Sequence, residues 1–434
     1  MSNAVFPFLA GALVVPALAQ EPTASSTPSS TPTSYPIECD PSDCDEPVEC
    51  DEPSSLECDP DESAGSVELV LSATIEPRVA DLEVVSMPSS SEAPNTSSDA
   101  PAGAPEVEPA PEYGLTGAWG GLRASLADRG IEFGASLILD THQIASGGID
   151  RDTITHSLFD FTASFDLAKL AGLKDAVLVA DAYVINGRNP TDSVGDFQSF
   201  SSISAGHVAQ LGQLYYEQYF LEQKLRVKLG KADTNSDFAA PDSSGDFVHS
   251  ASAFSPTLVG MATYPNPATC ALAFWQPNEA FYVGAGVYDG ATNAGIATGG
   301  HGPSTFFGSP SDLFLICESG YRWTCCADDL AGRFTLGAWR HTGDFDRFAG
   351  GTEDGTEGWY ASVDQELARL GGDGGGALAA FLQWGNADQD VADVDSHFGA
   401  GLACTGCCGR ADDSLGFYVS SVGFSEGAGT SADS

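Results

Sequence analysis

Basic residues are scarce in this 434-residue chain, and long apolar runs are missing. Lys and Arg together number 17 against 61 Asp and Glu, which gives a formal net charge of -44 at pH 7. A chain with this charge repels nucleic acid, which excludes a nucleic-acid partner. No window beyond the N-terminus holds about 18 uninterrupted apolar residues, as a membrane-spanning helix requires. The sequence therefore excludes a helical membrane protein as well.

Methionine and charged residues are also few, whereas glycine and aromatic residues are plentiful. The chain has 3 Met and 18% charged residues, but 49 Gly and 10% aromatic residues. Such a composition is unlike that of a helix-rich enzyme. It favours many short strands joined by glycine-rich turns.

The first residues predict export from the cytoplasm. Residues 1–19 are apolar and end in Ala17-Leu18-Ala19 before Gln20, the small-x-small pattern that signal peptidase cleaves. The run is too short to span a bilayer readily as a helix. We therefore predict a signal peptide over residues 1–19, which leaves the periplasm, the cell surface or the outer membrane as the destination.

Residues 20–112 have the composition of a disordered arm, rich in Pro, Ser, Thr and acidic residues. The stretch Val67–Val85 is more apolar, and the pattern leaves a strand and a helix equally open there. Cysteines alternate with acidic residues at Cys39, Cys44, Cys50 and Cys58. Their spacing matches no closed zinc signature, so local disulfides are favoured over a metal patch.

From Tyr113 onward the pattern predicts one short helix and then strands. Trp119–Arg129 has helical spacing and ends at Gly130. After it, apolar and polar residues alternate, for example over Phe159–Leu167. About thirteen segments have this pattern; they begin near Ile131, Thr155, Asp175, Gln213, Leu225, Thr269, Glu279, Asp312, Arg333, Glu357, Ala377, Asp395 and Ser414.

The lengths of the connections distinguish a membrane barrel from a soluble sandwich, which alternation alone does not. Short connections at 168–174, 222–224 and 276–278 alternate with long ones at 186–211, 231–268 and 290–311. Short turns at one rim and long loops at the other are typical of an outer-membrane barrel. We therefore predict an all-β fold, a transmembrane antiparallel β-barrel over residues 113–434.

Three stretches resemble the carbohydrate-selective porin family of the bacterial outer membrane. They are LTGAWGGLR at 115–123 with LADRGI at 126–131, NGRNP at 186–190, and YEQYFL at 216–221 followed by the strand from Leu225. The resemblance covers about Tyr113–Phe424 and implies a sixteen-stranded barrel with a constricted, charged lumen selective for sugars. The acidic, cysteine-bearing arm and the cysteine-rich turns depart from that family.

Alternation in a barrel predicts which side chains line the pore. The candidates are Asp160, Glu217, Lys224, Arg226, Lys228 and Arg333. Trp275 and Trp339 are candidates for stacking on sugars, although such aromatics more often form an interfacial girdle. Acidic stretches at Asp237–Asp246 and Asp388–Asp395 indicate a mouth that disfavours anions.

No motif in the sequence indicates an enzyme, a cofactor or a metal site. The seven histidines are scattered and none accompanies a Gly-x-Ser-x-Gly elbow. Cys325-Cys326 and Cys407-Cys408, with Cys404, lie in predicted periplasmic turns. Disulfides are favoured there, because Cys404-x-x-Cys407 is only half a zinc site.

Together these observations predict a porin for passive diffusion of mono- and oligosaccharides and other small solutes. A general porin without sugar preference, or an adhesive barrel, stays open as an alternative. Outer-membrane lipid is the expected surrounding, and monomer and homotrimer are both left open. The odd strand count further predicts that the chain is incomplete at its C-terminus, because such barrels have an even number of strands.

Overall fold

The computed structural model describes residues 70–75, 115–326, 329–370, 376–407 and 413–428. The chain divides into two compact units, and all of these residues belong to the one formed by Met1–Ala12 and Val67–Ser434. The predicted signal peptide, the arm cysteines and most of the predicted arm lie outside the described residues. None of the helices in the described ranges has the length and apolar character that a membrane crossing would need.

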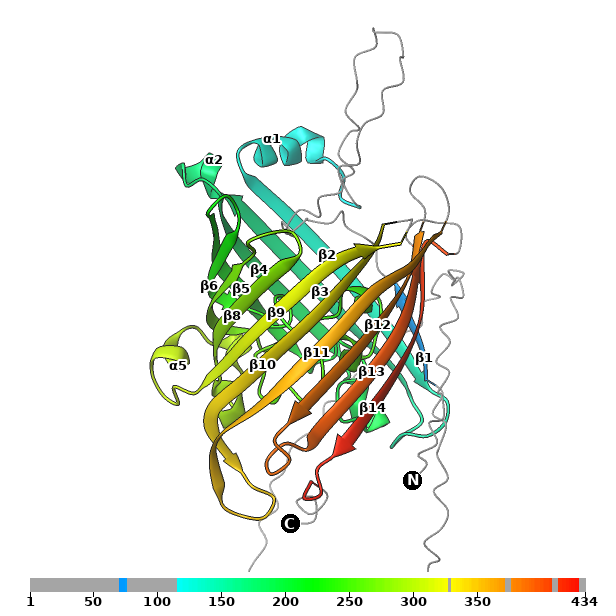
Figure 1. Ribbon diagram of the computed structural model, residues 1–434. Coiled ribbons are helices and arrows are strands. Elements are labelled where there is room, and N and C mark those ends of the chain that lie inside the picture. The colour runs from blue at the N-terminus through cyan, green and yellow to red at the C-terminus, as the bar shows by residue number, and fades with distance from the viewer. Residues whose placement is uncertain (1–69, 76–114, 327–328, 371–375, 408–412, 429–434) are drawn as a thin grey trace, which may run out of the picture. The chain divides into compact units, whose positions relative to one another are not determined.

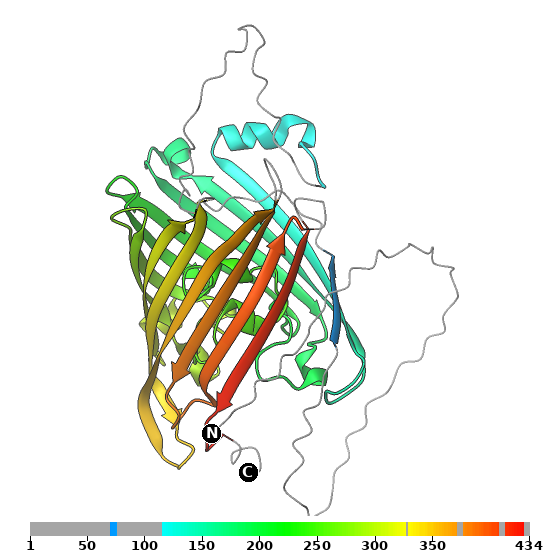
Figure 2. The same cartoon turned by 45° about the vertical axis from the view of Figure 1, so that its right-hand side comes forward.

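The described unit is built around one antiparallel sheet in which each strand pairs with its neighbours in sequence (Figures 1 and 2). Strand β1 (Val70–Ile75) pairs with β2, and the order then runs without a crossover to β14. The other strands are β2 Ile131–Ile144, β3 Thr153–Asp166, β4 Ala176–Gly187, β5 Val208–Phe220, β6 Leu225–Ala232, β7 Ala268–Trp275, β8 Phe281–Asp289, β9 Leu313–Cys325, β10 Leu330–Asp346, β11 Thr352–Leu370, β12 Gly376–Ala387, β13 Val394–Thr405 and β14 Ser414–Phe424.

The thirteen predicted strand segments are confirmed as β2–β14. Strand β1 is an additional strand and lies in the stretch Val67–Val85, where the sequence left strand and helix open. The predicted helix is confirmed as a 3-10 turn η1 (Trp119–Gly121) that continues into α1 (Leu122–Asp128). Gly130 follows it with φ of +85°, a left-handed conformation that favours glycine and lets the chain turn into β2.

The other helices are all short and lie in connections. They are α2 (Leu167–Ala171), α3 (Thr191–Val194), η2 (Asp242–Ser244), α4 (Ser250–Ala253), η3 (Ala291–Ala294), η4 (Thr298–Gly300) and α5 (Ser304–Phe307). The Asp166 side chain caps α2 by accepting from the amides of Ala168 and Lys169. This cap makes the β3–β4 connection compact, as expected for the short-turn rim.

The outer face of the sheet is apolar, whereas the inner face carries buried charged and polar side chains together with an apolar cluster that packs against residues 233–267. Large apolar side chains such as Phe159, Leu229 and Phe334 are exposed on the outer face. Their strand neighbours point inward and include buried polar residues such as Lys228 and Thr335. An apolar outer band around an interior that holds charged and polar side chains is the arrangement of a barrel in lipid. A water-soluble sandwich would place its apolar faces in the core instead.

Candidate functional site

The inner side of the sheet is crossed by the connection between β6 and β7, residues 233–267, which we call the inner loop. It contains η2 and α4 and lies within the curve of the strands (Figure 1). Its backbone contacts the wall at separate points. The amide of Ala239 donates to Glu318 of β9 at 2.9 Å, and the amide of Ser243 donates to Asp364 of β11 at 3.0 Å. The inner loop therefore narrows the interior.

A four-charge cluster fixes the start of the inner loop to β5 and β6. The Asp237 carboxylate lies 2.7 Å from the Arg226 guanidinium and 2.8 Å from the Lys228 ammonium. Glu217 of β5 is more distant, at 3.5 Å from Arg226 and 3.8 Å from Lys228. Arg226 also lies 4.8 Å over the ring of Phe274. Two carboxylates thus balance two cations, and Asp237 makes the closer contacts.

The buried state of this cluster makes pairing necessary. Side-chain exposure is 16% for Arg226, 4% for Lys228 and 1% for Asp237. Buried charges are stable only when they are paired and hydrogen-bonded. The cations therefore hold the inner loop in place.

A second cluster fixes the next part of the inner loop to β10 and β11. Arg333 contacts Asp242 of η2 at 2.9 Å and Asp364 at 3.6 Å, and it donates to the carbonyl oxygen of Ala240. Asp242 is itself largely exposed to the interior, as is Asp246 further along the inner loop. The exposed surface of the inner loop is therefore acidic.

The buried carboxylate of Glu318 accepts three hydrogen bonds. It accepts from the hydroxyl of Tyr282 at 2.7 Å, the hydroxyl of Tyr360 at 2.8 Å and the amide of Ala239. The three donors offset the cost of burying this side chain, because a buried polar group is costly unless it is hydrogen-bonded. The contact at Ala239 fixes the inner loop at a point between the two ionic contacts of Asp237 and Asp242.

The connection between β4 and β5, residues 188–207, also turns inward and supports the inner loop. Ser202 donates its amide to the carbonyl of Val248 at 2.8 Å, and Ser250 donates to the carbonyl of Ser199 at 3.2 Å. The middle of the inner loop reaches β12, where Gln383 donates to the carbonyl of Ala251 at 2.6 Å. The two inward loops thus form one connected structure across the interior.

Among the predicted pore residues, the structure places five charged side chains on the inner face. Glu217, Arg226, Lys228 and Arg333 hold the inner loop as described above. Asp160 is half-buried on β3 and accepts from the hydroxyl of Thr162 at 3.3 Å. Of these five, Asp160 is the one that lies apart from the inner loop's ionic contacts.

Of the other three predicted residues, two lie off the inner face, and one points inward but is buried. Lys224 lies exposed in the β5–β6 turn, one residue before β6 begins, so it is at the rim and not on the inner face. Trp275 points outward from the end of β7 with 47% of its surface exposed, which fits the girdle alternative. Trp339 points inward but is only 3% exposed and stacks on Phe314, so a sugar has no free ring face to contact.

The acidic stretch from Asp237 to Asp246 was expected at the mouth, and the structure places part of it deep inside. Alternation within strands gives the inward direction of Arg226 and Lys228, but it gives no information on where a long connection folds. A usable signal was present, since a buried Arg and Lys two residues apart on one face need carboxylates nearby. Asp237 follows nine residues after Lys228 and is the closer partner of both cations.

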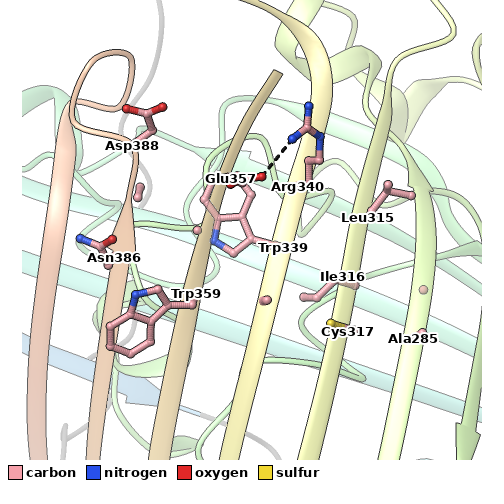
Figure 3. Close-up of a pocket in the computed structure, with 14 residues that line it drawn as sticks. Ala285, Leu315, Ile316, Cys317, Trp339, Arg340, Glu357, Trp359, Asn386 and Asp388 are labelled. Atoms are coloured by element: carbon pink, nitrogen blue, oxygen red, sulfur yellow. Dashed lines mark hydrogen bonds and ion pairs between the residues drawn. The ribbon is translucent and has the colours of Figure 1, made fainter. Parts of the chain in front are cut away.

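A groove of about 830 Å³ lies on the outer face of β8–β12 (Figure 3). Small residues such as Ala285 and Ala338 form part of its lining, together with the exposed ring of Trp359. Arg340 and Glu357 form an ion pair of 2.9 Å at this groove. The groove faces away from the inner loop, so it is separate from the candidate pore.

The predicted cysteine turns behave differently from one another. Cys404 and Cys407 form a disulfide at the end of β13, which confirms a disulfide at this turn. At the other turn, the sulfur atoms of Cys325 and Cys326 lie 3.3 Å apart. Cys408 lies outside the described residues.

The comparison with protein families agrees with the architecture. The model of the carbohydrate-selective porin, OprB family, matches residues 150–433. The chain belongs to the carbohydrate-selective porin family. The match begins just before β3 and includes the inner loop and both ionic clusters, so the family assignment rests on the region that forms the narrowed interior.

One curated relative and one solved structure are each less than 30% identical to this chain. Porin B of Pseudomonas aeruginosa is 28% identical over 133 residues, a region that covers 29% of this chain and 29% of Porin B. The high-pH structure of Pseudomonas putida OprB matches with a TM-score of 0.66 and 22% identity over 74% of this chain and 81% of that one. At this identity the structural likeness establishes the fold, and the barrel assignment is consistent with it.

Proposed function

We propose that this porin is a passive diffusion channel for mono- and oligosaccharides in the outer membrane. We further propose that a signal peptide at residues 1–19 directs its export to that membrane. Family membership and the shape of the interior support the proposal. The inner loop narrows the space inside the sheet, and paired charges at Asp237 and Asp242 keep it there. This built constriction is the observation that carries the proposal.

The chemistry of the constriction suits uncharged polyhydroxylated solutes. Carboxylates that a solute can reach lie on the inner loop at Asp242 and Asp246, and Asp160 is half-buried on the inner face of β3. The buried cations Arg226, Lys228 and Arg333 already form ion pairs with the inner loop, so they do not bind an anionic solute tightly. A channel must bind its solute weakly, because a tightly bound solute would not leave. Exposed Asp242 and Asp246 further disfavour anions.

The test is a planar-bilayer recording with the purified, full chain. We expect ion conductance with cation preference, and a concentration-dependent block of the current by neutral sugars. A ladder of maltose oligomers compared with polyethylene glycols of matched size would separate sugar recognition from simple obstruction.

The outcomes distinguish the candidate functions. Block by sugars but not by matched glycols supports the sugar channel. Equal block by both would assign a general porin instead. Correctly folded protein without any conductance would leave the adhesive barrel as the better account.

A further inference from the structure

Three ligand-type side chains converge at a second position on the inner wall, away from the ionic clusters of the inner loop. Asp140 and His142 come from β2, and His156 comes from β3. Asp140 lies directly opposite His156 in the β2–β3 ladder, and His142 lies two residues beyond Asp140 on the same face. The pairing register of β2 and β3 therefore brings His156 next to Asp140 and His142, although His156 is far from both in the sequence.

The three groups are buried and point at one another. Their exposed fractions are 3% for Asp140, 0% for His142 and 1% for His156. One oxygen of Asp140, Oδ2, lies 3.8 Å from Nε2 of His142 and 3.6 Å from Nε2 of His156. The two imidazole rings are stacked, with centroids 5.0 Å apart and 21° between their planes.

These separations suit a shared ion better than direct hydrogen bonds. A hydrogen bond between nitrogen and oxygen is about 2.7–3.2 Å long. Ligand atoms around a tetrahedral zinc ion, each about 2.0–2.2 Å from the metal, lie about 3.4 Å from one another. All three candidate ligand atoms lie within 4.8 Å of one another. The two oxygen–nitrogen separations are within about 0.4 Å of that value, whereas the separation between the two histidine nitrogens, at most 4.8 Å, would have to shorten further as the rings turn towards an ion.

We propose that Asp140, His142 and His156 bind a divalent transition-metal ion of the zinc class. Two imidazoles and one carboxylate are a donor set that zinc and its neighbours accept, whereas calcium and magnesium prefer oxygen ligands alone. The fourth position faces Ser201, whose hydroxyl donates to Oδ2 of Asp140 at 2.9 Å and lies 3.3 Å from Nε2 of His156. A water molecule or this hydroxyl completes the coordination.

The position of Ser201 gives the ion a structural consequence. Ser201 belongs to the 188–207 loop, and its neighbours Ser199 and Ser202 bond to the inner loop. A metal ion at the three ligands would therefore fix the wall, the 188–207 loop and, through it, the inner loop. The site is independent of which solute passes through the channel.

Metal content of the purified full chain tests the proposal. After treatment with a chelator and its removal, the wild type should take up one more Co²⁺ or Zn²⁺ per chain than the double variant His142→Ala/His156→Ala. Asp140→Asn should weaken that binding. His207→Ala is the matched control, because His207 is an exposed histidine of the same loop region, and it should bind as the wild type does.

Cysteines elsewhere in the chain can also bind these ions. The relevant quantity is therefore the difference in bound metal per chain between the wild type and the double variant. Cobalt bound to thiolates adds an intense near-ultraviolet band, whereas the imidazole and carboxylate site gives only the weak visible bands. Equal metal content in the wild type and the double variant would overturn the proposal. If the double variant does not fold, zinc-edge anomalous diffraction from wild-type crystals soaked in Zn²⁺ decides: a peak between the three side chains supports the site, and its absence there refutes it.

Discussion

Asp237 makes the shortest ionic contacts between the inner loop and the strands, at 2.7 and 2.8 Å. Replacing Asp237 by Asn removes one charge from the four-charge cluster and leaves Arg226 and Lys228 with Glu217 alone. Glu217 lies 3.5 and 3.8 Å from the two cations, beyond the 2.7 and 2.8 Å contacts that Asp237 makes. The cluster would then carry a net positive charge in a buried place.

The cost follows from the burial of the partners. Removing one member of a buried ion pair destabilises by about 3–5 kcal/mol, since an uncompensated charge remains. Each 1.4 kcal/mol is about a tenfold change in an equilibrium constant. The equilibrium for docking the first part of the inner loop should therefore fall at least roughly a hundredfold. The contacts at Asp364 and Gln383 stay in place and should retain the remainder of the loop.

Single-channel recording in a salt gradient measures both consequences. We expect greater current noise from the mobile loop and a reversal potential shifted towards anions, because two cations lose their closest carboxylate. Limited proteolysis of the detergent-solubilised protein should cut the inner loop faster. Asp246→Asn is the matched control: it removes the same charge from the same loop at an exposed position. If both variants change noise and proteolysis equally, or neither changes them, the cluster does not hold the loop.

Three further outcomes are expected. Trp339→Ala should lower the free energy of unfolding by about 3–5 kcal/mol without changing the sugar concentration that blocks half of the current. Trp275→Ala should lower the free energy of unfolding by less. Loss of sugar block in a stable Trp339 variant would show that the ring does contact the solute. Reducing the Cys404–Cys407 disulfide should lower the free energy of unfolding by only about 2 kcal/mol, because the loop that it closes is short. A much larger decrease, measured by thermal unfolding, would mean that the disulfide stabilises more than this turn. Burial lowers the pKa of His249 in the inner loop from 6.5 to about 4. The imidazole is therefore protonated more readily when the loop is released than when it is docked, so docking should weaken as the pH falls from 6.5 towards 4. The variant His249→Gln should lose this part of the pH dependence of the current noise.

The strands and their inward and outward faces were determined by the sequence. Period-two alternation is a local property, since successive side chains in a strand must point to opposite faces. This alternation by itself is enough to predict that Arg226, Lys228 and Arg333 share the inner face. Strand β1 does not follow in the same way, because the stretch Val67–Val85 has no alternation strong enough to separate strand from helix.

Only the tertiary structure decided what the inward residues do. The inner loop has no periodic pattern, so nothing local shows that it turns inside and that Asp237 and Asp242 meet the wall cations. Burial then changed the interpretation of Trp339, which points inward but packs under other side chains. The same dependence applies to Asp140, His142 and His156: their convergence follows from the pairing register of β2 and β3, and register depends on contacts between strands that a single strand's sequence does not contain.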